Sequence, residues 1–210
     1  PEGGLDFKNA QDSIKKICAD VGKPVIVKET GAGISREIAL MLEKSGVAVI
    51  DISGLGGTSF SLVESYRDKD KPPIGTAFKN WGIPTAVSIA ETRKTTKLPI
   101  IASGGVRTGI DAAKAICLGA DYAGLALPLL EPATKSKKEV KKVLEKIIKE
   151  LKTTMFLIGA KSINELKKKD IIITGKTREW LKERGINTKD FANRETLESL
   201  RTTVKSAMYR

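Results

Sequence analysis

Four short, mostly apolar segments recur along the chain, and segments with helical spacing of apolar residues separate them. The apolar segments cover residues 24–28, 47–52, 98–102 and 121–126. Short apolar runs of this kind are typical of strands in a parallel sheet. The alternation of strand and helix therefore predicts an α/β fold whose parallel strands follow one another in chain order.

The intervening segments carry helix signals. Predicted helices cover residues 6–20, 35–45, 84–94, 108–119 and 136–155. Thr108 and Asp111 have the spacing of a capping box, in which side chains and backbone cap each other at a helix start, and so do Ser136 and Glu139. Residues 54–81 have no clear period and are predicted to form a long excursion.

Beyond Ala160 the apolar pattern shortens. A short strand is predicted at residues 171–173, with helices at 177–184 and 194–207. We therefore divide the chain into a main unit, residues 1–160, and a C-terminal helical extension, residues 161–210.

Polar residues follow three of the predicted strands, at residues 28–30, at Asp51 and Ser53, and at residues 103–105. In a (β/α)8 TIM barrel the carboxyl ends of all strands meet on one face, where active sites form. A doubly wound sheet would gather ligand residues mainly at one switch point. The distribution favours half of a barrel, and four strands alone would leave two sheet edges and an apolar interior uncovered.

Several kinds of chemistry are excluded by what the chain lacks. It has no histidine, so histidine bases and histidine metal ligands are absent, and its two cysteines, Cys18 and Cys117, make neither a disulfide framework nor a zinc site. The net charge of +12 lies largely on lysine-rich helical segments without interleaved aromatic residues, which argues against nucleic-acid binding. No apolar run approaches the roughly 20 residues that span a membrane, and we expect a cytoplasmic protein.

Two glycine-rich loops follow the second and third predicted strands, at residues 54–59 and 103–109. Glycine lets a backbone approach a ligand closely, and amide groups at a helix start bind phosphate. Ser53 and Thr58 would add hydroxyl groups. Either loop alone could be a tight turn, but the pair favours a phosphate-bearing ligand.

Lys28 ends a predicted strand on the same face and needs an anionic partner. Glu29 or Asp51 could neutralise it within the fold, and a bound anion is the alternative. From the residues alone, the sequence predicts a phosphate-bearing ligand on a parallel α/β scaffold.

Distinctive strings occur at residues 27–29 (Val-Lys-Glu), 51–59, 81–85 (Trp-Gly-Ile-Pro-Thr), 102–109, 118–121, 155–161 and 173–175. Together they resemble the C-terminal half of the type 2 isopentenyl-diphosphate isomerase family, over nearly the whole chain. The Ser-Gly-Gly-Val-Arg string is shared by many FMN-dependent barrels. The Gly-x-Gly-Gly-Thr-Ser loop together with Trp-Gly-Ile-Pro-Thr is the specific part.

The resemblance implies a cytoplasmic, FMN-dependent (β/α)8 barrel, and a homo-oligomer is expected. That family interconverts isopentenyl and dimethylallyl diphosphate with reduced FMN, Mg²⁺ and NADPH or NADH as the reductant. By the same resemblance, Lys28 would lie near the flavin ring, and Ser53 and Thr58 would bind FMN. The FMN phosphate would be held by main-chain groups of Gly105, Val106 and Arg107 and by a second turn at Ala126 and Leu127, where many relatives carry Gly-Arg.

The N-terminal half of the family's barrel has no counterpart in this sequence. By the resemblance, that half would bring the first four strands, basic residues for the diphosphate, and a Gln-Glu pair that falls just before Pro1. We therefore assign no catalytic residue and no metal ligand here, Glu2 included. We expect the chain alone to be inactive and its partner to be the N-terminal half of the same protein.

Two alternatives remain open. One is an FMN-dependent 2-hydroxy-acid or glutamate-synthase-like oxidoreductase, although hydroxy-acid oxidation uses a histidine where this chain has residues 54–57, Gly-Leu-Gly-Gly. The other is a basic binding module without enzymatic activity.

Overall fold

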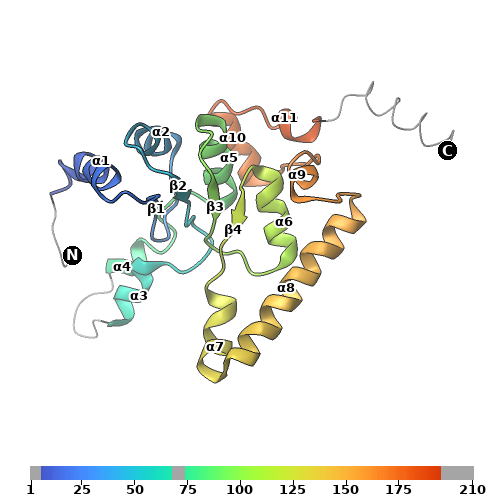
Figure 1. Cartoon of the computed structure of the whole chain (residues 1–210). Helices are drawn as coiled ribbons and strands as arrows, with labels where there is room; N and C mark the ends of the chain where they lie inside the picture. The colour runs from blue at the N-terminus through green and yellow to red at the C-terminus, as the bar shows by residue number, and fades with distance from the viewer. Residues whose placement is uncertain (1–5, 68–73, 195–210) are drawn as a thin grey trace.

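Four parallel strands form one sheet in the order β1-β2-β3-β4. A computed structural model describes residues 6–67 and 74–194 (Figure 1). The strands are β1 (Ile26–Lys28), β2 (Val49–Asp51), β3 (Ile100–Ala102) and β4 (Tyr122–Ala123). The predicted parallel α/β half-barrel is confirmed, although each strand is shorter than predicted, and β4 most of all.

The two faces of the sheet differ in what covers them. Ile50 and Ile100 are register partners that point toward the helices, and both are fully buried. The next row across the sheet runs from Lys28 through Asp51 and Ile101 to Tyr122, which is 61% exposed. Helices therefore cover one face, and the face that would line a barrel interior is open within the described residues.

Helices alternate with the strands as the sequence predicts. The predicted ones are α1 (Ala10–Asp20), α2 (Arg36–Lys44), α5 (Thr85–Thr95), α6 (Gly109–Leu118), α8 (Lys137–Leu157) and α10 (Gly175–Glu183). Both predicted caps form: Thr108 and Asp111 make a reciprocal capping box, whereas Ser136 accepts from the Glu139 amide in one direction only.

The structure also corrects the sequence analysis. The excursion at residues 54–81 contains two short helices, and three more were missed further along the chain. These five are α3 (Phe60–Arg67), α4 (Ile74–Ala77), α7 (Leu127–Lys135), α9 (Ile163–Leu166) and α11 (Lys189–Ala192). No secondary structure was predicted for the segment that forms α7, because the fourth predicted strand ends at residue 126.

The predicted strand at residues 171–173 is wrong. Ile171 makes one backbone hydrogen bond, to Phe191, and no ladder forms. The apolar character of this stretch instead serves burial, because Ile171 and Ile173 pack with the main core. Except for Arg194, the predicted helix at 194–207 lies outside the described residues, as does Glu2.

A long helical hairpin of α7 and α8 projects from the sheet (Figure 1). The α8 helix crosses the start of α6 at Gly109, where an added Cβ would lie 2.2 Å from the Leu151 nitrogen. The Gly109 amide donates to Glu150 Oε2 on the same helix (2.8 Å). Glycine at this position thus permits close packing of the two helices.

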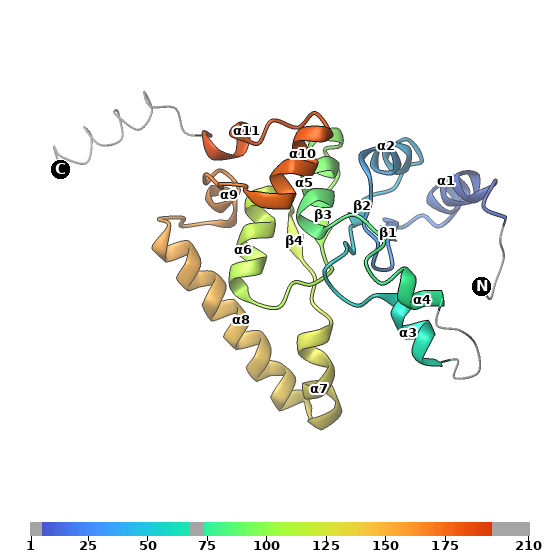
Figure 2. The ribbon, with the colours of Figure 1, turned by 180° about the vertical axis from the view of Figure 1, so that it is seen from behind.

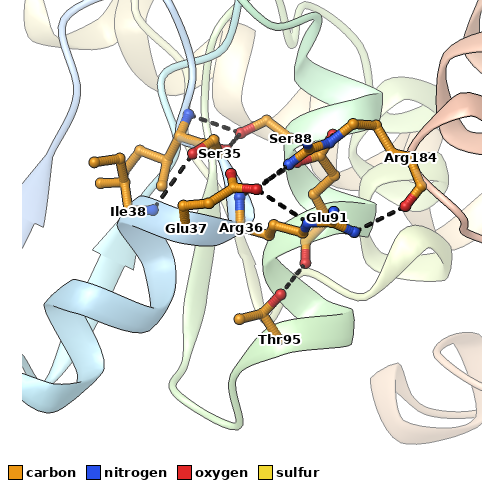
Figure 3. A network of polar contacts seen from close by, with 9 residues as sticks. Ser35, Arg36, Glu37, Ile38, Ser88, Glu91, Thr95 and Arg184 are labelled. Carbon is orange, nitrogen blue, oxygen red and sulfur yellow. Dashed lines mark hydrogen bonds and ion pairs between the residues drawn. The ribbon is translucent and has the colours of Figure 1, made fainter.

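The segment after residue 160 folds back against the helical layer, where α10 lies beside α5 (Figure 2). Its attachment centres on Glu91 of α5, a carboxylate only 1% exposed. Arg184 donates to both Glu91 oxygens, at 3.1 and 3.3 Å, and Arg36 adds its backbone amide at 3.3 Å (Figure 3). Arg184 also bonds Glu37, and this contact lowers the pKa of the Glu37 carboxyl to about 2.

We predict that Arg184→Met lowers the free energy of unfolding of the chain by about 2–3 kcal/mol, because it strands the buried Glu91 carboxylate. The matched control is Lys94→Met, which breaks the half-exposed Lys94–Asp190 ion pair. That change should cost less than about 1 kcal/mol. Urea unfolding of both variants measures the difference, and equal losses would contradict a special role for the buried pair.

Candidate cofactor site

A cavity of about 370 Å³ lies where the four strands end, within the roughly 300–1,000 Å³ typical of small-molecule sites. Every strand end contributes to it. Its lining contains all eight predicted cofactor residues: Lys28, Ser53, Thr58, Gly105, Val106, Arg107, Ala126 and Leu127. Asp51, Ser103, Thr30 and the apolar residues Phe60 and Leu125 also line it.

Lys28 extends from the end of β1 along the open face of the sheet. Its Nζ donates to the Glu29 carbonyl oxygen at 2.8 Å and to Ser53 Oγ at 3.0 Å. Within the described residues it makes no ion pair, although Asp51 is its register partner on β2. Neither nearby carboxylate neutralises the ammonium, so its charge is available to an anion in the cavity.

Asp51 and Ser103 bond each other below the rim of the cavity, with Ser103 Oγ donating to Asp51 Oδ1 at 2.5 Å. Ser53 has a positive φ of 39°, the only non-glycine residue described with one. Such a conformation is uncommon outside glycine and is concentrated at ligand sites. It fits a hydroxyl that accepts from Lys28 at the end of β2.

The two glycine-rich loops touch each other through their backbones. A Cβ on Gly104 would lie 2.2 Å from the Gly54 carbonyl oxygen, and one on Gly105 would lie 2.3 Å from that of Gly56. Thr85 fastens the contact, since its Oγ1 donates to the Gly104 carbonyl at 2.6 Å. These glycines therefore meet a requirement of loop packing in addition to any approach to a ligand.

The amides available to a phosphate differ from the expected set. The Arg107 amide donates to Asp111 Oδ2 at 3.2 Å, and the Thr108 amide donates to the same oxygen at 3.0 Å. Burial acts to raise the pKa of Asp111, but the hydrogen bonds from Thr108 and from the two amides outweigh it and lower that pKa. The start of α6 is thus capped by the protein itself.

Other amides at the cavity have no partner within the described residues. They are those of Gly105 and Val106 in the loop after β3, and those of Leu125, Ala126 and Leu127 at the start of α7. Two turns therefore present amide groups to one cavity, and the dipole of α7 adds to the second. This donor set suits a phosphate group.

Two features of the site were not predicted from the sequence. Thr85 was part of a recognised string, but nothing in the string indicated that its hydroxyl holds the Gly104 loop. Pro128 lies in the first turn of α7, where proline is favourable, but Pro132 lies inside the helix and made a helix there unexpected. No group of three or more potential metal ligands is present among the residues the structure describes, and none of their helices is long and apolar enough to cross a membrane.

A family model described as FMN-dependent dehydrogenase matches residues 5–173. An isopentenyl-diphosphate delta-isomerase from Methanothermobacter thermautotrophicus is 51% identical over 194 residues, covering 92% of this chain and 55% of that protein. Its namesake from Pyrococcus furiosus is 49% identical over 197 residues, covering 92% and 50%. The chain thus spans about half the length of the curated relatives it matches.

Solved structures give a consistent fold. A lactate oxidase from Pediococcus acidilactici superposes with a TM-score of 0.61 at 26% identity, over 79% of this chain and 41% of that one. A mandelate oxidase superposes with a TM-score of 0.57 at 20% identity, over 75% of this chain and 40% of that one. At that identity, the mandelate oxidase supports the barrel fold alone.

We predict that Gly105→Ala weakens FMN binding at least about tenfold, because the new Cβ pushes the loop away from Gly56 and misdirects the adjacent amides. The matched control is Gly159→Ala, at a glycine with φ of +65° and open space around it. That variant should lose about 1 kcal/mol of stability to backbone strain and keep its FMN affinity. Fluorescence titration with FMN measures both, and unchanged affinity in Gly105→Ala would contradict the phosphate assignment.

Proposed function

This chain belongs to the family of FMN-dependent dehydrogenases, and from that premise we propose that its cavity holds FMN. The observation that carries the proposal is that one cavity combines Lys28 with two turns of backbone amides, none of which has an ion-pair or hydrogen-bond partner for that role among residues 6–67 and 74–194, apart from the two contacts that hold the Lys28 ammonium. A flavin mononucleotide needs both kinds of partner: donors for its phosphate and a cation for its reduced ring. The donor set therefore fits the cofactor.

We further propose that the complete protein interconverts isopentenyl and dimethylallyl diphosphate. Support comes from the relatives of about 50% identity over about 90% of this chain that carry that name. When bound, reduced FMN supplies the proton transfer or electron density that moving a carbon–carbon double bond requires. The remaining roles fall to the protein.

Each residue then has a defined task. Lys28 Nζ stabilises negative charge beside it, and Ser53 and the Glu29 carbonyl hold that ammonium in place. The amides of Gly105, Val106, Ala126 and Leu127 bind the phosphate, while Arg107 contributes its side chain. Thr58 would add a hydroxyl to the cavity lining, and Asp51 and Ser103 keep each other's polar atoms paired there.

The remaining parts of the reaction belong to residues outside this sequence. We propose that an N-terminal half-barrel covers the open sheet face, holds the substrate diphosphate through basic residues, and supplies a Gln-Glu pair for Mg²⁺ and proton transfer. NADPH or NADH would reduce the flavin. We also propose a cytoplasmic homo-oligomer, in keeping with the free thiols of Cys18 and Cys117.

The activity is tested by producing the chain together with the N-terminal segment of the Methanothermobacter thermautotrophicus relative that it does not match. We expect a yellow complex that isomerises isopentenyl diphosphate in the presence of Mg²⁺ and NADPH, followed by proton NMR, and no turnover by the chain alone. A yellow complex without isomerisation would contradict the isomerase proposal. Bleaching of its flavin by lactate would instead support the oxidoreductase, which the family description and the likeness to a lactate oxidase favour.

In that complex, Lys28→Met should lower turnover by about 100-fold, because it removes a cation next to the developing negative charge. Lys152→Met, at an exposed lysine of α8, is the control and should leave turnover unchanged. Turnover equal to that of the parent in Lys28→Met would assign Lys28 a structural role. Thermal unfolding of both variants shows whether folding accounts for any loss.

A further inference from the structure

The carboxylate of Glu29 occupies a ring of backbone amides directly after β1. Its Oε2 accepts from the amides of Gly31 and Ala32, each at 2.5 Å, and from that of Gly33 at 3.1 Å. Gly31 and Gly33 have φ of +135° and +78°, which turn successive N–H groups toward one point. Converging amides of this kind form an anion-binding nest, and here the anion is a side chain of the same loop.

The loop around this nest is fixed from outside by four further hydrogen bonds. The Gly33 amide also donates to the Ser53 carbonyl at 3.1 Å, and the Ile83 amide donates to the Ala32 carbonyl at 2.7 Å. Ser88 accepts from the Ile34 amide and donates to its carbonyl. Only the centre of the loop, where three amides converge, depends on the Glu29 carboxylate.

The same residue holds Lys28 through its main chain. Lys28 Nζ donates to the Glu29 carbonyl oxygen, and that carbonyl belongs to the residue whose side chain is anchored in the nest. The Glu29 amide donates in turn to the Asp51 carbonyl at 3.1 Å. The bonds of the Glu29 carboxylate to the nest therefore fix the orientation of the Glu29 carbonyl. That carbonyl in turn fixes the position of the Lys28 ammonium.

The nest also decides where the charge of Lys28 acts. A glutamate next to a lysine can form an ion pair with it, which would cancel much of the cation's field. Here the Glu29 carboxylate is turned into the amides, and Lys28 makes no ion pair within the described residues. The loop thereby separates two opposite charges on adjacent residues and leaves the cation facing the cavity.

We propose that Glu29 is a positioning residue for Lys28: seated in the nest, it sets the carbonyl that holds the ammonium and keeps that ammonium unpaired toward the flavin. The inference rests on the proposed function, because it assumes that FMN occupies the cavity. It predicts that an external carboxylate can replace the missing side chain. A residue of purely structural importance elsewhere would not respond in this way.

The test uses Glu29→Ala, Glu29→Gln and the control Glu165→Ala in the complex described above. Glu165 is an apt control, since its carboxylate also accepts a backbone amide, that of Lys161 at 2.9 Å, at an exposed site outside the cavity lining. We expect Glu29→Ala to bind FMN at least about tenfold more weakly and to lower its midpoint potential, because the cation that favours the reduced anion is displaced. Formate or acetate should restore both quantities in Glu29→Ala, with no such effect on the parent or on Glu165→Ala.

Glu29→Gln keeps the size of the side chain and one acceptor oxygen, and it replaces Glu29→Ala in the test if that variant does not fold. Its midpoint potential should fall in the same direction by a smaller amount. Two outcomes would overturn this inference alone, provided that the parent complex binds FMN. One is an unchanged midpoint potential in Glu29→Gln, and the other is a folded Glu29→Ala variant that acetate does not rescue. A parent complex that fails to bind FMN would overturn the proposed function and this inference together.

Discussion

The sheet packs one of its faces against helices and leaves the other open within the described residues. Ile50 and Ile100 are fully buried against the helices, whereas Ile26 and Tyr122 on the opposite face are more than half exposed. Parallel sheets are ordinarily covered on both faces, so we expect a further layer on this one. Lys28 and Asp51 lie on the same open face, which places the chemistry and the uncovered surface together.

The course of the main chain around the sheet was predictable because local signals agree with the fold. Apolar runs marked the four strands, and the Thr108–Asp111 spacing marked a helix start that forms as expected. The predictions failed where apolar residues are buried without belonging to a strand or helix. Ile171 and Ile173 look like a strand because they are β-branched, yet they fill gaps in the core without a neighbouring strand to pair with.

The clustering of the expected residues was predictable from the sequence, whereas their hydrogen-bond partners were not. All eight expected residues line one cavity, because the carboxyl ends of parallel strands converge. Which amides are free could not be read from the sequence, since the Arg107 amide is taken by Asp111, four residues away and on the next helix. The nest of Glu29 was hidden for a similar reason: a carboxylate beside a lysine suggests an ion pair, and only the backbone angles of Gly31 and Gly33 reveal another partner.

The backbone contact between the two glycine-rich loops has a consequence for how this site can diverge. Gly54 and Gly104 touch through main-chain atoms, and Gly56 and Gly105 do the same, so at these contacts neither loop has a side chain that could become smaller to admit a larger neighbour. A substitution in one loop cannot be offset by a compensating change in the opposite glycine, which has nothing left to remove. Sequence change at this rim is therefore restricted at all four contact glycines, and new side chains would enter it at loop positions outside these contacts.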